Sequence, residues 1–184
     1  MNSNGAVDTD AAIQHPNIFY FVIDGSWSLV DDLEYWNKGN ITTTANSNTV
    51  YKTIYSPSPT GYIEPKSIAF TGFTTTGENT VNSGQYNVSG AFNKGWNFYS
   101  LPNFQGSTIF FSTLGLRDVT SSRVSTVTAG MPTSIYIDGS YWTANPSSLH
   151  SKARVFSGQG NNNGVYPLGE NYRGYGMSLR SVLE

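Results

Sequence analysis

The sequence contains no cysteine and only two histidines, and each shortage excludes a kind of chemistry. Without cysteine the chain forms no disulfide, no zinc cluster with thiolate ligands and no thiol nucleophile. His15 lies in a polar N-terminal stretch and His150 in a Ser-rich segment, so we expect neither a two-histidine metal site nor a catalytic histidine. The G-x-S-x-G motif of serine hydrolases is also absent. We therefore expect that the protein is not an enzyme and has no cofactor.

Charge is also sparse, because Asp, Glu, Lys and Arg make up 12% of the chain, against roughly 25% in an average soluble protein. The net charge is -2 and no block of Lys or Arg occurs, so the chain lacks the basic field that nucleic acid or an anionic membrane surface attracts. No apolar run reaches membrane-spanning length and no signal-peptide pattern is visible. We expect no nucleic-acid partner and no membrane insertion.

Aromatic residues, glycine, asparagine, serine and threonine are abundant, with 14% aromatics and 19 glycines. This mixture is poor for helices and good for strands joined by turns. The length of 184 residues suits one domain, residues 1–184, and we expect an α+β, mostly β fold with residues 1–16 as a loose lead-in. β-branched and aromatic runs predict strands at Ile18–Ile23, Tyr51–Tyr55, Trp96–Leu101, Thr108–Leu116, Ser134–Ile137, Ser140–Ala144, Ala153–Phe156 and Tyr175–Val182.

Helical signals are confined to one or two short stretches. Pro65 suits the first helical position and Gly72 stands near the end, which predicts a helix over residues 65–73 with Ile68 and Phe73 on one face. One further helical turn is expected over residues 31–36. The polar stretch 74–95 is expected to hold a small hairpin around Gln85–Val88.

Four blocks of sequence carry a family resemblance. The segment KTIYSPSPTGYIEP (52–65) is followed by FFSTLGLRD (110–118), GSYWTA (139–144) and RGYGMSLRSV (173–182). Together they resemble, in order and spacing, the "vYDPCPpGyrvP", "fpalGyRd", "GyYWSs" and "R..GfSVRpV" motifs of the Fibrobacter-type major paralogous domain of gut bacteria. Here Ser58 replaces the family cysteine, residues 74–95 look like an insertion, and Ala153–Phe156 is shorter than the usual strand.

The resemblance implies a C-type-lectin-like fold in which the terminal strands pair, here Ile18–Ile23 antiparallel with Tyr175–Val182. It implies framework roles for Trp142 and Arg173. The fold is shared with variable proteins diversified by retroelements, and such domains sit at the tips of fimbriae, other surface fibres and phage tails. The resemblance therefore places the protein at the cell surface, secreted or on a virion tail, as a monomer when isolated.

Calcium is the ion that sugar-binding C-type lectins use, and it needs several converging carboxylates and carbonyls. Lectins of that kind carry Glu-Pro-Asn or Gln-Pro-Asp, whereas Glu64-Pro65 is followed here by Lys66. The acidic cluster at 31–34 has the composition of a solvated helix start. We expect no metal site.

The segment 143–175 is rich in Tyr, Asn, Ser and Gly, the residues that antibody loops use for contact area and adaptable hydrogen bonds. We expect it to form one exposed loop patch, centred on Tyr166, Tyr172 and Asn161–Asn163, because polar turn-rich segments are poorly buried. The candidate ligand-binding residues are Thr143, Asn145, Ser147, His150, Arg154, Gln159, Asn161, Asn162, Asn163, Tyr166, Glu170, Asn171, Tyr172 and Tyr175.

Two functions follow from these expectations. One is an adhesin or receptor-binding tip on a bacterial fibre or phage tail, which binds a protein or glycan on a host or neighbouring cell. The other is a carbohydrate-binding accessory module of a surface glycan-utilisation complex. An exposed aromatic platform would favour sugar, and a broad polar Tyr/Asn patch would favour a protein.

Overall fold

The computed structural model describes residues 2–22, 25–30, 34–92, 95–117, 124–125, 138–149, 151–159 and 164–184. This part of the chain is mostly β, as expected, with three short helices, α1 (Thr9–Gln14), η1 (Thr71–Phe73) and η2 (Ser83–Gln85). The strands are β1 (Asn2–Asn4), β2 (Phe19–Phe21), β3 (Tyr62–Ile63), β4 (Val88–Phe92), β5 (Gly95–Leu101), β6 (Gln105–Ser112), β7 (Leu116–Arg117), β8 (Val124–Ser125), β9 (Asp138–Pro146), β10 (Lys152–Gln159), β11 (Gly164–Tyr172), β12 (Ser178–Leu179) and β13 (Val182–Leu183).

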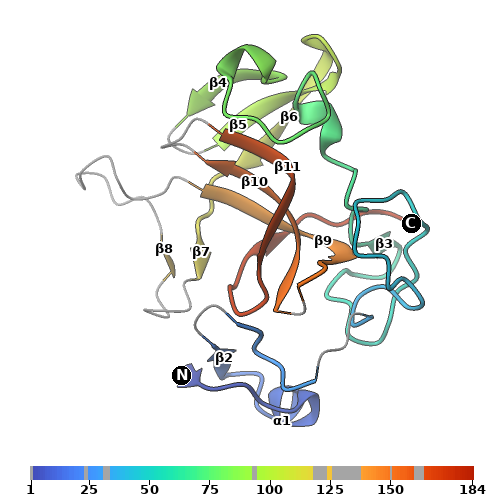
Figure 1. The fold of residues 1–184 in the computed structure, drawn as a ribbon, viewed down its shortest axis with the longest axis vertical. Helices are drawn as coiled ribbons and strands as arrows, with labels where there is room; N and C mark the ends of the chain where they lie inside the picture. The colour runs from blue at the N-terminus through green and yellow to red at the C-terminus, as the bar shows by residue number, and fades with distance from the viewer. Residues whose placement is uncertain are drawn as a thin grey trace.

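The centre of the molecule is a four-stranded sheet of order β11-β10-β9-β12 (Figure 1). β9, β10 and β11 follow one another antiparallel, and β12 pairs with β9 in parallel. The predicted strands at 140–144 and 153–156 are confirmed as the middles of β9 and β10. β11 occupies residues that we expected to be loop.

A second antiparallel sheet of order β4-β5-β6 lies at one end of the central sheet, at the top of Figure 1. β5 confirms the strand predicted at 96–101, while β6 ends at Ser112, before the predicted Leu116. The remaining short strands form three pairs, β1-β2, β3-β13 and β7-β8. The strand predicted at Ser134–Ile137 lies outside the described residues.

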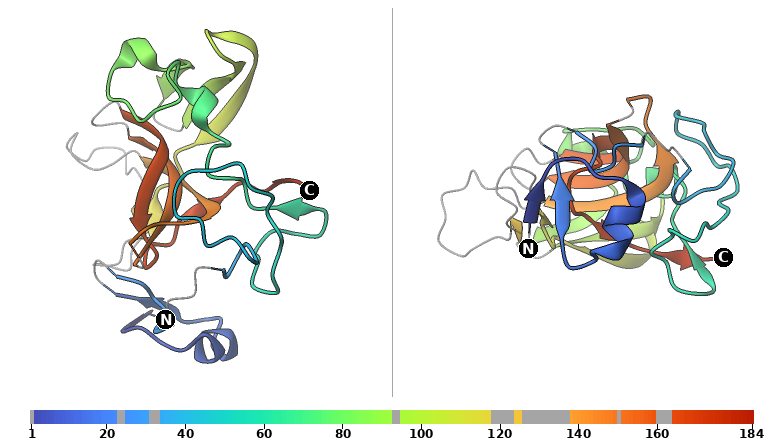
Figure 2. Two further views of the ribbon diagram at one scale, coloured as in Figure 1. Left: turned by 45° about the vertical axis from the view of Figure 1, so that its right-hand side comes forward. Right: turned by 90° about the horizontal axis from the view of Figure 1, so that it is seen from below.

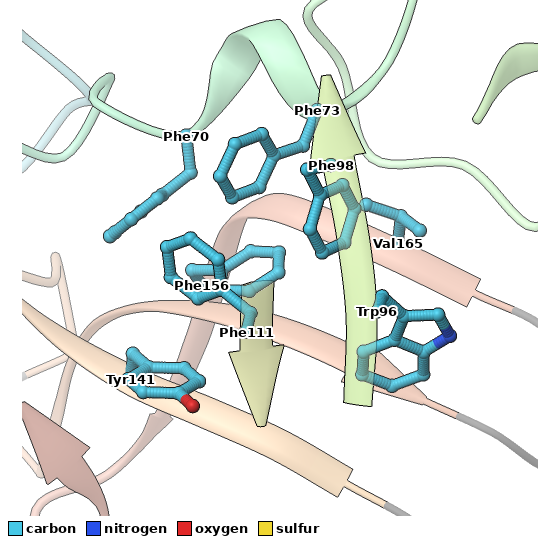
Figure 3. Packing of buried hydrophobic residues seen from close by; sticks show 8 residues of the cluster. All are labelled: Phe70, Phe73, Trp96, Phe98, Phe111, Tyr141, Phe156 and Val165. Atoms are coloured by element: carbon cyan, nitrogen blue, oxygen red, sulfur yellow. The ribbon is translucent and has the colours of Figure 1, made fainter. Parts of the chain in front are cut away.

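The main hydrophobic core lies between these two sheets and is built almost entirely of aromatic rings (Figure 3). The Phe73 and Phe98 rings stack with their centroids 4.1 Å apart. Phe156, from β10, is fully buried and lies within 5.1 to 6.1 Å of five other rings. Each such phenyl ring contributes roughly 1.5–3 kcal/mol on burial, so this cluster supplies much of the stability that holds the two sheets together.

The helix predicted over residues 65–73 is not an α-helix. Its backbone bonds run from each amide to the carbonyl three residues earlier, from Ala69 to Lys66 and from Phe73 to Phe70, and only η1 is regular. In 3₁₀ geometry residues three apart share a face, which places both Phe70 and Phe73 in the core. Ile68, which we expected on the buried face, is 36% exposed.

The N-terminal residues are more ordered than the expected lead-in. β1 pairs in parallel with β2, and α1 connects them (Figure 1). Both views in Figure 2 show β1, β2 and α1 together across one end of the central sheet. We call residues 2–30 the N-terminal unit.

The expected pairing of the terminal strands is wrong. β2 pairs with β1, whereas the last segment divides between β12, beside β9, and β13, beside β3. Tyr175–Val182 is not one strand, because Gly176 forms an isolated bridge with Arg117 and the chain then turns to reach β9. The C-type-lectin-like topology with joined ends is therefore not what these strands form.

Residues 34–61 contain no regular element and are fixed by side chains that bind the backbone. The buried Asn37 accepts a bond from the Tyr51 amide at 2.9 Å. Lys52 donates to the carbonyls of Ser58 and Pro59 at 2.6 and 2.9 Å.

The strand expected at Tyr51–Tyr55 is instead a turn, and the hairpin expected at Gln85–Val88 is η2 followed by the start of β4. The described part of the helical turn expected at 31–36 is non-helical.

Candidate functional site

A pocket of about 700 Å³ lies between the N-terminal unit and the adjacent end of β9 and β10. Its walls come from segments far apart in the sequence. In Figure 1 the N-terminal unit lies below the central sheet. The described residues that line it are Thr9, Ala12, Ile13, Ile18, Phe19, Tyr20, Trp27, Tyr35, Trp36, Ile54, Tyr55, Trp142, Thr143, Ala144, Asn145, Pro146, Lys152, Ala153, Arg173, Gly174 and Tyr175. The volume falls within the roughly 300–1,000 Å³ of typical ligand sites.

The side of the pocket formed by the central sheet is an irregular stretch of β9. The register between β9 and β10 shifts between the pairs Ala153–Pro146 and Val155–Trp142, so β9 carries two more residues than β10 across this interval. Such a bulge breaks the strict alternation of side chains between the two faces of a strand. Consistent with this, all five residues from Trp142 to Pro146 line the pocket.

The opposite wall is a set of interlocked aromatic rings. Trp27 stacks on Tyr35 with ring centroids 5.8 Å apart, and Tyr55 meets the same Tyr35 ring edge-on at 5.6 Å. The Tyr35 hydroxyl is hydrogen-bonded to Thr9 at 2.6 Å and to Ser28 at 3.0 Å. These contacts fix the ring from both ends, so this wall is formed before any ligand arrives.

The two sides of the pocket also meet through tryptophan. Trp36 and the buried Trp142 lie edge to face, with centroids 6.4 Å apart. The expected framework role of Trp142 is consistent with its burial, but this residue also lines the pocket. Three of the four tryptophans of the chain are pocket residues, since Trp27 lines it as well.

The kind of aromatic residue differs between the pocket and the core. The core cluster contains five phenylalanines. Of the aromatic residues that line the pocket, only Phe19 is a phenylalanine, and the others carry an indole N–H or a phenol hydroxyl. Tyr and Trp join a large apolar face to a polar edge. The pocket is therefore suited to a ligand that is itself amphipathic.

One polar group in the wall has no partner among the described residues. Asn145 is 2% exposed, and its Oδ1 accepts a hydrogen bond from the Ser67 amide at 2.8 Å. This bond fixes the orientation of the amide, because only the oxygen can accept. The Nδ2 atom is buried with no acceptor in the described part of the chain. A buried donor of this kind costs about 1–3 kcal/mol unless something satisfies it.

The charged residues that line the pocket, among those the structure describes, are basic. Lys152 and Arg173 line it, and no Asp or Glu of the described residues does. The Lys152 ammonium lies 4.7 Å from the centre of the Tyr172 ring, its cross-strand neighbour. The Arg173 backbone amide donates to the Ser151 carbonyl at 2.8 Å, and the framework role expected for its side chain stays a prediction.

The predicted binding segment is a sheet rather than a loop patch, because β9, β10 and β11 occupy most of it. Thr143, Asn145 and Ser147 are buried at 2%, 2% and 1% exposure, so the expectation that they form an exposed patch is wrong. Thr143 donates to the Arg154 carbonyl at 3.1 Å. Ser148, directly after these residues, is exposed.

The remaining candidates divide between structural contacts and half-buried strand positions. Arg154 binds the Thr43 carbonyl through two nitrogens and pairs with Glu170 at 3.0 Å. Tyr166, Asn171 and Tyr172 are half-buried in β11, and Tyr175 is half-buried after it. Gln159 ends β10. His150 and Asn161–Asn163 lie outside the described residues. Of the predicted set, Thr143, Asn145 and Tyr175 come together at the pocket.

The aromatic wall formed by Trp27, Tyr35, Trp36 and Tyr55 was missed from the sequence. Its only local signal is the density of Trp and Tyr between residues 27 and 55. Such density is equally typical of core residues, and nothing local indicates that this segment faces β9.

A metal site in the described ranges would require several ligand side chains close together. No three His, Asp or Glu side chains there lie close enough to share a metal ion. Within the same residues, no helix is both long and apolar enough to cross a membrane. Comparisons with protein families, with curated proteins and with solved structures find no match to the chain. The resemblance to the Fibrobacter-type domain therefore stays a prediction.

Proposed function

We propose that this protein is a glycan-binding module and that it holds a saccharide in the aromatic pocket. The observation that carries the proposal is the lining itself, a set of Trp and Tyr rings that hold one another in place. A sugar ring presents C–H groups on its faces and hydroxyls around its edge. Ring faces of Trp and Tyr suit the C–H groups, and indole N–H and phenol hydroxyl groups suit the sugar hydroxyls.

The setting we propose is the one expected from the sequence, a domain displayed on a bacterial surface fibre or a phage tail. Low charge and abundant Tyr, Asn and Gly support an extracellular binding role. The mode of binding differs from the one first expected, since the aromatic pocket takes the place of a loop patch over residues 143–175.

A protein receptor is the second candidate, and the rim of the pocket favours it. Ile54 is 91% exposed, Ile13 is 56% exposed, and both line the mouth of the cavity. Exposed apolar side chains beside a pocket are typical of surfaces that meet a macromolecule. A glycan carried on a protein would engage both features.

The test is a glycan array probed with the wild-type protein and two tyrosine variants. Tyr55→Ala removes an exposed pocket ring that contacts Tyr35, whereas Tyr51→Ala removes a 62% exposed ring outside the pocket. We expect the wild type to bind a defined set of glycans, Tyr55→Ala to lose about tenfold in affinity, which is roughly 1.4 kcal/mol, and Tyr51→Ala to bind normally. Equal effects of the two variants, or no glycan bound by the wild type, would contradict the proposal.

A further inference from the structure

The charged residues that line the pocket indicate which class of saccharide it would bind. Among the described lining residues are two cations and no carboxylate. Arg173 has interactions of its own within the protein, so we assign the electrostatic preference of the pocket to Lys152. An aromatic cage that binds a cationic ligand needs neutral or acidic residues around it. Here Lys152, beside the rings, carries the same positive charge as such a ligand. A cationic ligand is therefore disfavoured, and an anion is favoured.

Lys152 lines the pocket and is the first residue of β10. Its ammonium lies over the ring of Tyr172, its cross-strand neighbour in β11, which is not itself a lining residue. The nearby Arg154 shows the contrast, because its charge is paired with Glu170 and its guanidinium also binds the Thr43 and Leu168 carbonyls. In the described part of the chain, Lys152 contacts no carboxylate.

Asn145 is part of the wall and does not offer a donor to the ligand. Its Oδ1 accepts a hydrogen bond from the Ser67 amide, and its Nδ2 is buried without accessible surface. The preference for an acidic ligand is therefore assigned to Lys152.

We propose that the pocket selects a saccharide bearing a carboxylate, a uronic or sialic acid residue, over its neutral counterpart. This inference rests on the proposed glycan-binding function and adds the charge of the ligand to it. Lys152 supplies the electrostatic preference, and the Trp and Tyr rings pack against the sugar faces. Neutral saccharides of the same shape retain the ring contacts and bind more weakly.

The experiment compares matched acidic and neutral probes. Oligouronates with their carboxyl-reduced forms, and sialylated with desialylated N-glycans, are titrated by intrinsic tryptophan fluorescence at low salt. The proteins are the wild type, Lys152→Gln, and Lys38→Gln as an exposed control outside the pocket. We expect the wild type to bind one class of acidic probe about tenfold more tightly than its neutral partner. Lys152→Gln should abolish this difference in affinity while binding of the neutral probe persists. Lys38→Gln should show the same difference as the wild type.

The two pairs of probes distinguish uronic from sialic acid as the source of the carboxylate. If acidic and neutral members bind equally and Lys152→Gln changes nothing, the charge inference is overturned while the glycan-binding proposal stands. If no probe of either charge binds, the charge inference is overturned, and the glycan array separately decides whether the glycan-binding proposal stands. Preferential binding of the neutral members would also overturn the inference.

Discussion

Substitution of Gly158 by alanine should destabilise the fold, because the new methyl group would clash with one side chain, Trp96. Gly158 pairs with Gly139 across β10 and β9, and Trp96 from β5 packs on them. A Cβ atom at Gly158 would lie 2.5, 2.8 and 3.0 Å from three carbons of the Trp96 indole, and one at Gly139 would lie 3.3 Å from it. The indole is buried in the core cluster between its own sheet and the central sheet, so it has little room to yield.

Forcing a methyl group into a packed core typically costs about 1–3 kcal/mol. For a chain of this length that corresponds to a fall in Tm of roughly 2–12 °C. Urea unfolding followed by circular dichroism measures the free energy, and a thermal melt measures Tm. Gly72→Ala is the matched control, because a Cβ there meets nothing within 4 Å; we expect it to be neutral or stabilising by up to about 1 kcal/mol.

A double-mutant cycle with Trp96→Leu isolates the cause. The smaller side chain removes the indole carbons that the new methyl group meets, so Gly158→Ala should cost less than about 0.5 kcal/mol in that background. The reasoning is refuted if Gly158→Ala is as stable as Gly72→Ala, or if its cost is the same with and without Trp96. Either result would mean that the two sheets do not pack through this glycine pair.

Two further predictions concern tyrosines on or beside the central sheet. Burial, and then the neighbouring Tyr166, raises the pKa of Tyr86 above its ordinary value, so the neutral phenol is favoured in the folded state. The free energy of unfolding should therefore fall as the pH rises through about 10. Tyr86→Phe should remove that part of the fall, which urea unfolding between about pH 8 and 11 measures. Tyr166 and Tyr172 are half-buried in β11, so replacing both with alanine should lower the free energy of unfolding by about 1–3 kcal/mol. A change near zero would mean that both are surface residues, as the sequence predicted.

Strands with local hydrophobic patterns could be predicted from the sequence, and β11 shows where that signal fails. β5 and β10 are runs of aromatic and β-branched residues. β11 contains Pro167, two glycines and one asparagine, residues that are typical of loops. It still forms a strand because it lies at the edge of the sheet and because Pro167 falls at a register shift opposite β10.

The errors in the helix and in the terminal strands have tertiary causes. Pro65 and Gly72 are ordinary helix-boundary residues, yet the core requires Phe70 and Phe73 on one side, which 3₁₀ turns provide. The strand at 19–21 finds a partner in residues 2–4, which carry no hydrophobic pattern at all. Pairings of this kind depend on main-chain hydrogen bonds and leave no mark in the side chains.

The candidate site could be predicted only in part, for the same reason. Thr143, Asn145 and Tyr175 were identified through their polar and aromatic character, but their partners Trp27, Tyr35 and Tyr55 come from more than 80 residues earlier in the chain. The bulge in β9 that turns five consecutive residues to the pocket is a property of its pairing with β10. Sequence composition indicated a binding protein, and the packing of the N-terminal unit on the sheet defines where we propose that binding occurs.

The most direct test of the glycan pocket is ¹⁹F NMR of protein labelled with 5-fluorotryptophan, titrated with a glycan that binds on the array. The chain has four tryptophans, of which Trp27, Trp36 and Trp142 line the pocket and Trp96 lies in the core. The account predicts that three resonances shift on binding while the Trp96 resonance, assigned with Trp96→Phe, stays in place. Binding that moves none of the three pocket resonances, or that moves Trp96 alone, would contradict it.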